Sequence, residues 1–228
     1  MNLLAIETAS ESCSVALSAA GEVCTRQAHA PREHAERLLP WVQSLLAEAG
    51  LRVHDLDAIA FSRGPGSFTS LRIGIGVVQG LAWGAQVPVV PVSSLQTMAQ
   101  ASVARGVGAA LVALDARMDE VYGGLFRLDE HSIMRPDGPE RVGSPAALAA
   151  MATAEVTGVG NGFARYAELA AVGPSLAGVH ADIWPEASSL LTLAAAWLEC
   201  NPPLPPEQAQ AVYLRDRVAD KPPGAAGS

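Results

Sequence analysis

The chain has 228 residues, half of them apolar, which is enough for two small domains with cores of their own. Its formal net charge of −8 comes from 23 acidic and 15 basic residues, and the basic residues are scattered along the sequence. Because affinity for nucleic acid rests mainly on Lys and Arg that neutralise phosphates, we expect contact with RNA only through a more basic partner.

The cysteines and the N-terminus indicate a soluble cytoplasmic protein. Cys13, Cys24 and Cys200 show no C-x-x-C pair and no Cys/His metal spacing, so they are expected to be reduced. The sequence opens without the basic region of a signal peptide, and no run approaches the roughly 18 apolar residues of a membrane span.

The N-terminal part of the chain predicts three strands followed by alternating helices and strands. The pattern predicts strands over 2–7, 14–20, 22–28, 57–62 and 87–92, and helices over 33–49, 68–86 and 93–104. This order is that of a ribonuclease-H-like lobe, which we expect to span 1–105 and to carry the partner-binding helices.

The order of elements then restarts. The segment 111–115 (Leu-Val-Ala-Leu-Asp) resembles 3–7 (Leu-Leu-Ala-Ile-Glu), and both end in an acid. An internal duplication of this kind predicts an α/β protein with two ribonuclease-H-like lobes in an actin-like arrangement, the second lobe degenerate. We place that lobe at 106–217, with helices near 145–153, 163–171 and 187–200, and expect a disordered tail at 218–228.

The segment from Ser62 to Arg72 joins a strand to a helix through Gly64 and Gly66, with Ser67 in position to cap the helix. Free N–H groups at such a helix start can hold a phosphate or carboxylate. A tight turn that holds no ligand is the alternative, because the segment matches neither G-x-x-x-x-G-K-[ST] nor G-x-G-x-x-G.

The helix expected at 68–86 carries Gly76, Gly80 and Gly84 on one face, at four-residue spacing. Each interior glycine costs about 1 kcal/mol relative to alanine, so the three together cost about 3 kcal/mol. Close approach of another helix would offset that cost. Packing against the sheet of the same lobe is the alternative.

The helix expected at 33–49 has apolar residues over an arc of roughly 160°, wider than the roughly 100° stripe that a surface helix needs. One side of it is therefore spare, and beside a glycine face it predicts a partner surface. The residues assigned to that surface are Leu38, Trp41, Val42, Leu45, Arg72, Gly76, Gly80 and Gly84. Without a partner, the same surface is expected to form a two-fold homodimer.

Candidate catalytic groups are few. Glu7, Asp115 and Asp119 could hold Mg²⁺ and water, as in actin-like phosphotransferases, although strand-end acids can equally cap or pair with a neighbour such as Arg117. The histidines show no H-x-x-x-H or H-E-x-x-H pair, and no G-x-S-x-G elbow is present. We therefore expect no catalytic residue, no metal and no cofactor.

Several segments together resemble the bacterial TsaB family, also called YeaZ. They are Leu4-Ala5-Ile6-Glu7-Thr8-Ala9, His34-Ala35-Glu36-Arg37-Leu38-Leu39-Pro40, Gly64-Pro65-Gly66-Ser67-Phe68-Thr69, Leu71-Arg72-Ile73-Gly74, Asp115-Ala116-Arg117-Met118-Asp119-Glu120-Val121-Tyr122 and Tyr213-Leu214-Arg215. The stretch 64–74 is the most specific. Ser70 departs from the family pattern, which usually has glycine there.

The resemblance implies a non-catalytic subunit needed to make N6-threonylcarbamoyladenosine at position 37 of tRNA. Such a subunit binds and activates its catalytic paralogue TsaD, the ATPase TsaE joins them, and tRNA is contacted only indirectly. The paralogue has an H-x-x-x-H metal pair where this chain has Ser94 and Met98, which do not suit a metal as histidines do. A residual cleft would then be formed by Glu7, Thr8, Gly64, Ser67, Asp115 and Arg117.

Two other functions compete with this one. An autonomous actin-like ATPase or phosphotransferase is favoured if the cleft holds a nucleotide with Mg²⁺ on Glu7 or Asp115. A peptidase is the third reading, and the sequence offers neither a nucleophile motif nor a metal pair for it.

Overall fold

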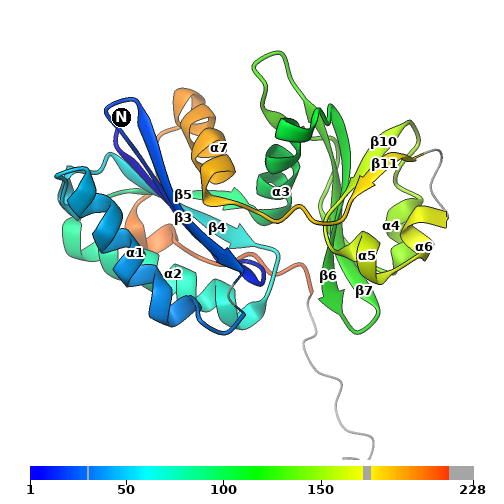
Figure 1. Ribbon diagram of the computed structural model, residues 1–228, viewed down its shortest axis with the longest axis horizontal. Helices are drawn as coiled ribbons and strands as arrows, with labels where there is room; N and C mark the ends of the chain where they lie inside the picture. Colours follow the sequence, from blue (N-terminus) through cyan, green and yellow to red (C-terminus); the bar gives the residue numbers. More distant parts are fainter. Residues whose placement is uncertain (30, 172–175, 216–228) are drawn as a thin grey trace, which may run out of the picture.

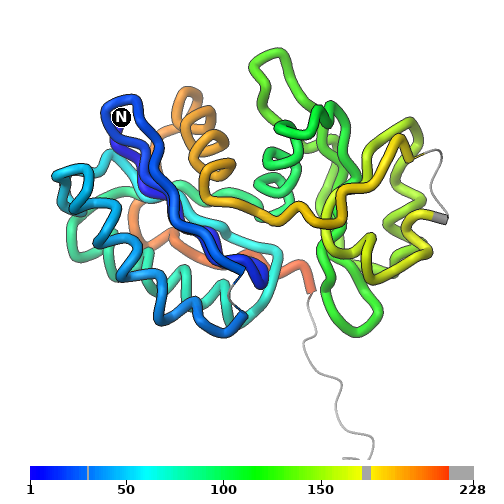
Figure 2. The backbone as a smooth tube through the Cα atoms, viewed as in Figure 1, coloured from blue at the N-terminus to red at the C-terminus, as the bar shows by residue number. Residues whose placement is uncertain are grey.

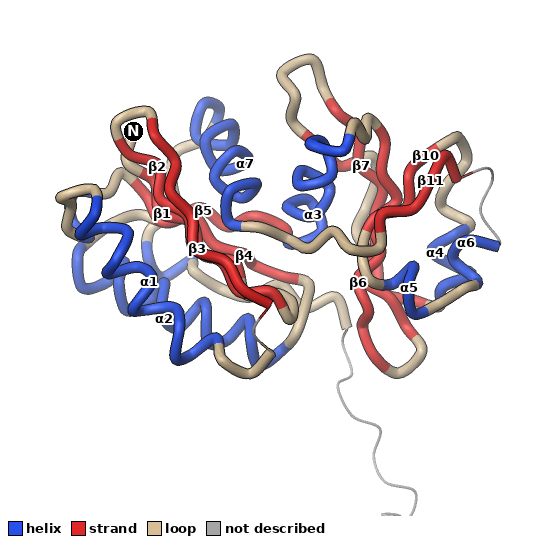
Figure 3. Tube along the Cα trace, in the orientation of Figure 1, coloured by secondary structure: helices blue, strands red, loops and turns tan. Residues whose placement is uncertain are grey.

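The computed structural model describes residues 1–29, 31–171 and 176–215, and it consists of two lobes, each built on its own β-sheet (Figures 1 and 3). The expected tail at 218–228 lies outside the described residues. Among those residues, no helix is both long and apolar enough to cross a membrane.

The first sheet has five strands in the order β3-β2-β1-β4-β5. The strands are β1 (Leu3–Glu7), β2 (Ser12–Ala19), β3 (Glu22–His29), β4 (Ala58–Gly64) and β5 (Val89–Ser93). Strands β1, β2 and β3 form an antiparallel meander, while β4 and β5 run parallel to β1. This is the strand arrangement of a ribonuclease-H-like lobe, as expected.

Helices cover both faces of this sheet. Helices α1 (His34–Glu48) and α2 (Phe68–Ala85) pack on one face, and α7 (Ala187–Cys200) packs on the other. Side chains of β1 alternate accordingly: Leu4 and Ile6 lie in the core with α1 and α2, and Leu3 and Ala5 lie in the core with α7. Both faces are buried, which is why the strand reads as a continuous apolar run.

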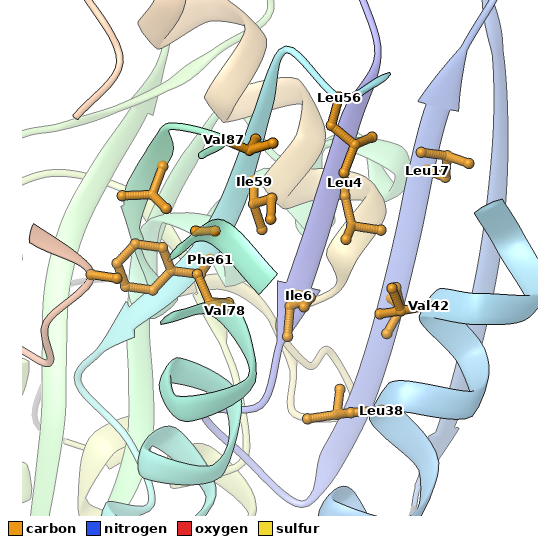
Figure 4. Close-up of a cluster of buried hydrophobic side chains, with 14 of the residues drawn as sticks. Leu4, Ile6, Leu17, Leu38, Val42, Leu56, Ile59, Phe61, Val78 and Val87 are labelled. Atoms are coloured by element: carbon orange, nitrogen blue, oxygen red, sulfur yellow. The ribbon is translucent and has the colours of Figure 1, made fainter. Parts of the chain in front are cut away.

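Three residues assigned to the partner surface lie in this core instead. Leu38, Val42 and Leu45 of α1 have 0%, 1% and 0% of their surface exposed. Figure 4 shows Leu38 and Val42 beside Ile6 of β1. Because α1 packs against both the sheet and α2, the lobe itself covers this part of the wide apolar arc, and these three side chains are not available to a partner.

The second sheet has the order β11-β10-β6-β7-β8, with β9 also paired to β7. Its strands are β6 (Ala109–Arg117), β7 (Glu120–Leu128), β8 (Met134–Pro136), β9 (Arg141–Gly143), β10 (Val156–Val159) and β11 (Leu176–His180). Strand β6 pairs antiparallel with β7 and parallel with β10, just as β1 pairs with β2 and β4. The two lobes thus share the central part of their topology.

Helix α3 (Ser94–Ser102) covers one face of the second sheet, and α4 (Pro145–Ala149), α5 (Gly162–Arg165) and α6 (Glu168–Ala171) cover the other. The single helix expected at 163–171 is therefore two short ones. Three 3₁₀ turns complete the described elements: η1 (Val53–Asp55), η2 (Val103–Arg105) and η3 (Pro206–Gln208).

The last helix returns to the first lobe. The chain crosses back from β11 to the first sheet before α7 begins (Figure 2). Helix α7, expected in the lobe at 106–217, instead buries Leu190, Leu191 and Ala194 against the first sheet. The division of the chain into domains at 105/106 stays a prediction, with α7 and the C-terminal segment attached to the first sheet.

Candidate functional site

The three aligned glycines of α2 face away from the lobe. Gly76, Gly80 and Gly84 are exposed, and a Cβ added at any of them would meet nothing within 4 Å outside its own stretch of helix. The buried side of α2 consists of Leu71, Gly74, Ile75, Val78 and Ala82. Packing against the sheet of the same lobe therefore does not explain the aligned glycines.

Exposed large side chains border this glycine face. Phe68 and Trp83, at opposite ends of α2, are 41% and 52% exposed. On α1, Trp41 is half-buried with the Arg37 guanidinium 5.6 Å from its ring centre, and Leu39 is 43% exposed. Of the predicted partner-surface residues, Trp41, Arg72 and the three glycines are thus accessible, whereas Phe68, Trp83 and Leu39 were not assigned to it.

The glycine-rich turn before α2 and the first half of α2 pack tightly on the residues that follow β1. A Cβ at Gly66 would lie 2.2 Å from the Ala9 carbonyl oxygen, and one at Gly74 would lie 2.2 Å from Thr8 Oγ1. The Ser67 N–H donates to the same Ala9 carbonyl at 2.8 Å. Close packing accounts for these glycines, in agreement with a tight turn. Ser67 stands at the N-cap position, but its side chain makes no capping hydrogen bond.

A cavity of about 990 Å³ lies between the lobes. Of the six predicted cleft residues, Ser67, Asp115 and Arg117 line it, and Glu7, Thr8 and Gly64 do not. Other residues that line the cavity were not assigned to it from the sequence, because they come from several separate elements, loops and the C-terminal segment. These include Arg32, Asn161, Trp184 and Arg215.

Glu7 is buried beneath the cleft rather than in it. Its side chain has no exposed surface, and one carboxylate oxygen accepts the Ala9 N–H at 2.7 Å. The other oxygen has no hydrogen-bond partner among the described residues. Burial raises the pKa of Glu7 to about 7. A carboxyl that is partly protonated near neutral pH and does not reach the cavity is a poor Mg²⁺ ligand.

The carboxylate of Asp115 makes hydrogen bonds and ion pairs with residues of its own lobe. It accepts hydrogen bonds from the Arg117 N–H and the Tyr166 hydroxyl, both at 3.0 Å. The guanidinium groups of Arg117 and Arg165 lie 3.4 and 3.5 Å from its carboxylate. The structure therefore shows Asp115 paired with Arg117, which was the alternative to Mg²⁺ binding. Within 1–29, 31–171 and 176–215, no three His, Cys, Asp or Glu side chains are grouped so as to hold a metal.

Ser94 and Met98, which the family resemblance matched to a metal pair, are both buried and pack within the chain. The Ser94 hydroxyl lies 2.7 Å from that of Ser62, and both residues are buried. Met98 is fully buried in the core between α3 and the second sheet, close to Gly160. Both side chains are thus committed to contacts within the chain.

Comparison with known proteins identifies the family. The model of the TsaD family, described as tRNA N6-adenosine threonylcarbamoyltransferase, matches residues 21–180. The tRNA threonylcarbamoyladenosine biosynthesis protein TsaB of Escherichia coli K12 is 39% identical in an alignment of 225 positions that covers 97% of each chain. The chain belongs to the TsaB family. The resemblance indicated by the sequence motifs is thereby confirmed.

Solved structures of TsaB relatives, under the name YeaZ, share the whole fold. YeaZ from Pseudomonas aeruginosa is 42% identical with a TM-score of 0.85, over 93% of this chain and 99% of that one. A second Pseudomonas aeruginosa structure, described as a protein with similarity to peptidase YEAZ, is 43% identical with a TM-score of 0.86, over 94% and 99%. The predicted α/β fold, with two ribonuclease-H-like lobes in an actin-like arrangement, is confirmed.

Proposed function

We propose that this chain is a non-catalytic subunit in the synthesis of N6-threonylcarbamoyladenosine at position 37 of tRNA. It binds and activates a TsaD-like catalytic subunit, and a TsaE-like ATPase joins the pair. The observation that carries the proposal is the exposed glycine face of α2 in a member of the TsaB family. Gly76, Gly80 and Gly84 weaken the helix, and no described residue outside it lies within 4 Å of the position a Cβ would take, so a helix of another protein is what they fit.

The lack of catalysis is proposed from what the candidate groups are doing. Asp115 is held by two arginines and Tyr166, Glu7 is buried, and Ser94 and Met98 are packed in the interior. The net charge of −8 also disfavours direct binding to the phosphate backbone. Chemistry and tRNA binding are therefore assigned to the partner.

Activation of the partner requires a differential interaction. A subunit that bound the active and inactive conformations of TsaD equally well would not change the equilibrium between them. The glycine face of α2 lets a helix of the partner approach closely, and close packing of two backbones fixes the position of that helix. Such a contact can favour the active conformation of the partner over the inactive one.

The test is a pull-down and a reconstituted assay with the TsaD-like and TsaE-like proteins of the same organism. With donor, ATP and tRNA present, omitting this chain should remove most of the modification, and this chain with donor and tRNA alone should give none. Full modification without the chain would refute the proposal, and transfer by the chain alone would show that it is itself the enzyme.

A second candidate function is that of an autonomous actin-like ATPase or phosphotransferase. The cavity between the lobes is the observation that favours it. Its opening onto the N-terminus of α2 favours an anionic ligand, whereas the burial of Glu7 and the ion pairs of Asp115 disfavour Mg²⁺. Measuring ATP binding with and without Mg²⁺ decides the matter. Assaying peptide hydrolysis in parallel covers the peptidase reading, for which the described residues offer no metal cluster.

A further inference from the structure

A groove of about 350 Å³ runs between α2 and the segment 209–215, which we call the strap. Three hydrogen bonds fix the strap against the first lobe. The Gln79 side chain donates to the Ala209 carbonyl at 2.8 Å, the Val212 N–H donates to the Arg63 carbonyl at 2.8 Å, and Arg72 Nε donates to the Tyr213 hydroxyl at 3.3 Å. The lining includes Arg72, Ile75, Gly76, Gln79, Ala211 and Tyr213.

One end of the groove carries an exposed aromatic pair with an arginine. The rings of Phe68 and Tyr213 lie 5.5 Å apart between centres, and the Arg72 guanidinium lies 3.7 Å from the centre of the Phe68 ring. Phe68 and Tyr213 are 41% and 45% exposed. Stacking and the bond to Tyr213 hold the guanidinium in place before any partner arrives, which lowers the entropic cost of binding.

Arg72 is a cation without a counter-charge in the described part of the chain. No carboxylate there lies within 4.0 Å of its guanidinium, and among the described residues its one hydrogen bond is the bond from Nε to the Tyr213 hydroxyl. It is also the one charged residue of α2. Arginine and aromatic side chains around a small pocket are the usual composition of the energetically dominant part of an interface.

We infer that this groove is a second docking point for the TsaD-like subunit, and that the partner supplies a carboxylate to Arg72 and an apolar side chain that enters the groove above Gly76. The inference rests on the proposed function. Gly76 belongs both to the groove and to the exposed glycine face, so a helix seated on that face extends into the groove without a break.

The charge on α2 favours this partner over a second copy of the chain. Helix α2 contains no acidic residue, so a two-fold contact between two α2 helices would offer Arg72 no carboxylate from the facing helix. An acidic side chain from a different protein satisfies the guanidinium, and the aromatic pair then shields the ion pair from water.

The test compares dissociation constants for the TsaD-like subunit of the same organism, measured by calorimetry with the full chain. Arg72→Gln and Tyr213→Ala should each weaken binding by about tenfold or more, because each removes a group at the centre of the docking point. Arg127→Gln is the matched control, since Arg127 is an exposed arginine of the second sheet, paired with Asp137, and it should change binding less than about twofold.

The outcomes separate the two proposals. If wild type binds and Gly80→Leu does not, but Arg72→Gln and Tyr213→Ala bind like wild type, the groove is not a docking point although the proposed function stands. If the two groove variants lose only self-association in sedimentation, the occupant is a second copy and the inference is wrong. If wild type does not bind the TsaD-like subunit at all, both proposals fail. Circular dichroism checks that each variant is folded.

Discussion

Two kinds of glycine stand on α2, and their surroundings give them different roles. Gly74 lies against Thr8 of the first lobe, where a Cβ would come within 2.2 Å of Oγ1. Gly80, on the opposite side, has nothing within 4 Å. Glycine lowers the stability of the helix at both positions. At Gly74 it permits close packing within the chain, whereas at Gly80 it leaves room for a contact that the chain itself does not make.

Replacing Gly80 with leucine should abolish binding to the TsaD-like subunit without weakening the fold. A side chain here has room in the isolated chain, and leucine favours helix by up to about 1 kcal/mol over glycine, so the melting temperature should hold or rise. Pull-down and thermal unfolding measure the two effects. Gly108→Leu is the control, an exposed glycine outside α2 with an equally open Cβ position. Retained binding by Gly80→Leu would place the interface elsewhere.

Replacing Gly74 with alanine should have the reverse effect. The added methyl group collides with Thr8, and overpacking of this kind costs about 1–3 kcal/mol of unfolding free energy. Urea unfolding measures the loss. The double variant Gly74→Ala with Thr8→Ala should recover part of it, because the second change removes the colliding atoms. Equal stability of Gly74→Ala and wild type would mean that α2 can shift away from β1 at little cost.

The carboxyl of Glu7 should make stability fall as pH rises. Burial raises its pKa from 4.5 to about 7, so the folded state holds a proton that the unfolded state has already released between these values. The stabilising contribution is complete below pH about 4.5 and is lost as pH passes 7, an effect of up to about 3 kcal/mol. Glu7→Gln should remove this slope in urea unfolding measured at several pH values. Glu22→Gln, at an exposed position on β3, should keep it.

At the scale of elements, the strap joins the two lobes. It is bonded to β4 through Val212, and at its end the Arg215 guanidinium donates to the Ala116 carbonyl at 3.2 Å and to the Glu120 carboxylate, both in the β6–β7 hairpin. The Arg215 side chain is 17% exposed. A short segment without helix or strand is therefore fixed at both ends, and it holds Tyr213 beside α2.

Arg215→Gln should loosen the strap. Losing a half-buried ion pair and a bond to a carbonyl should lower the unfolding free energy by about 1 kcal/mol, and the displaced Tyr213 should also weaken binding to the TsaD-like subunit. Arg141→Gln, at an exposed position on β9, is the control in both measurements. Weaker stability with unchanged partner binding would show that Arg215 holds the lobes together but does not position Tyr213.

The elements also show what the sequence could and could not predict. Periodicity located α1 and α2 to within a residue or two, because each has a continuous buried side. The partner surface on α1 was wrong for Leu38, Val42 and Leu45, because an apolar arc of this width is also what a helix needs when it packs against both a sheet and a neighbouring helix. The apolar pattern of α7 is equally compatible with either sheet, so its return to the first lobe could not be predicted.

At the scale of the whole molecule, buried polar contacts tie the lobes together beside α3. The Ser62 and Ser94 hydroxyls meet at the start of this helix, and the Ser93 hydroxyl donates to the Glu140 carboxylate of the second lobe. Glu140 is half-buried, and this burial raises the pKa of its carboxyl group. The motif at 64–74 could be recognised in the sequence, but the groove beside the strap could not, because it joins residues about 140 positions apart, such as Arg72 and Tyr213.

The exposed face of α2 should also govern self-association. An open face with glycines and the exposed Phe68 and Trp83 is costly in water, and a two-fold dimer is the commonest way to cover such a face. Alone and at high concentration, the chain should therefore sediment as a dimer, and Gly80→Leu should sediment as a monomer. Because one face cannot hold two helices at once, adding the TsaD-like subunit should replace the homodimer with a complex containing one copy of each chain. A homodimer that persists after the TsaD-like subunit has bound would mean that the two contacts use different surfaces, and then α2 could serve only one of them.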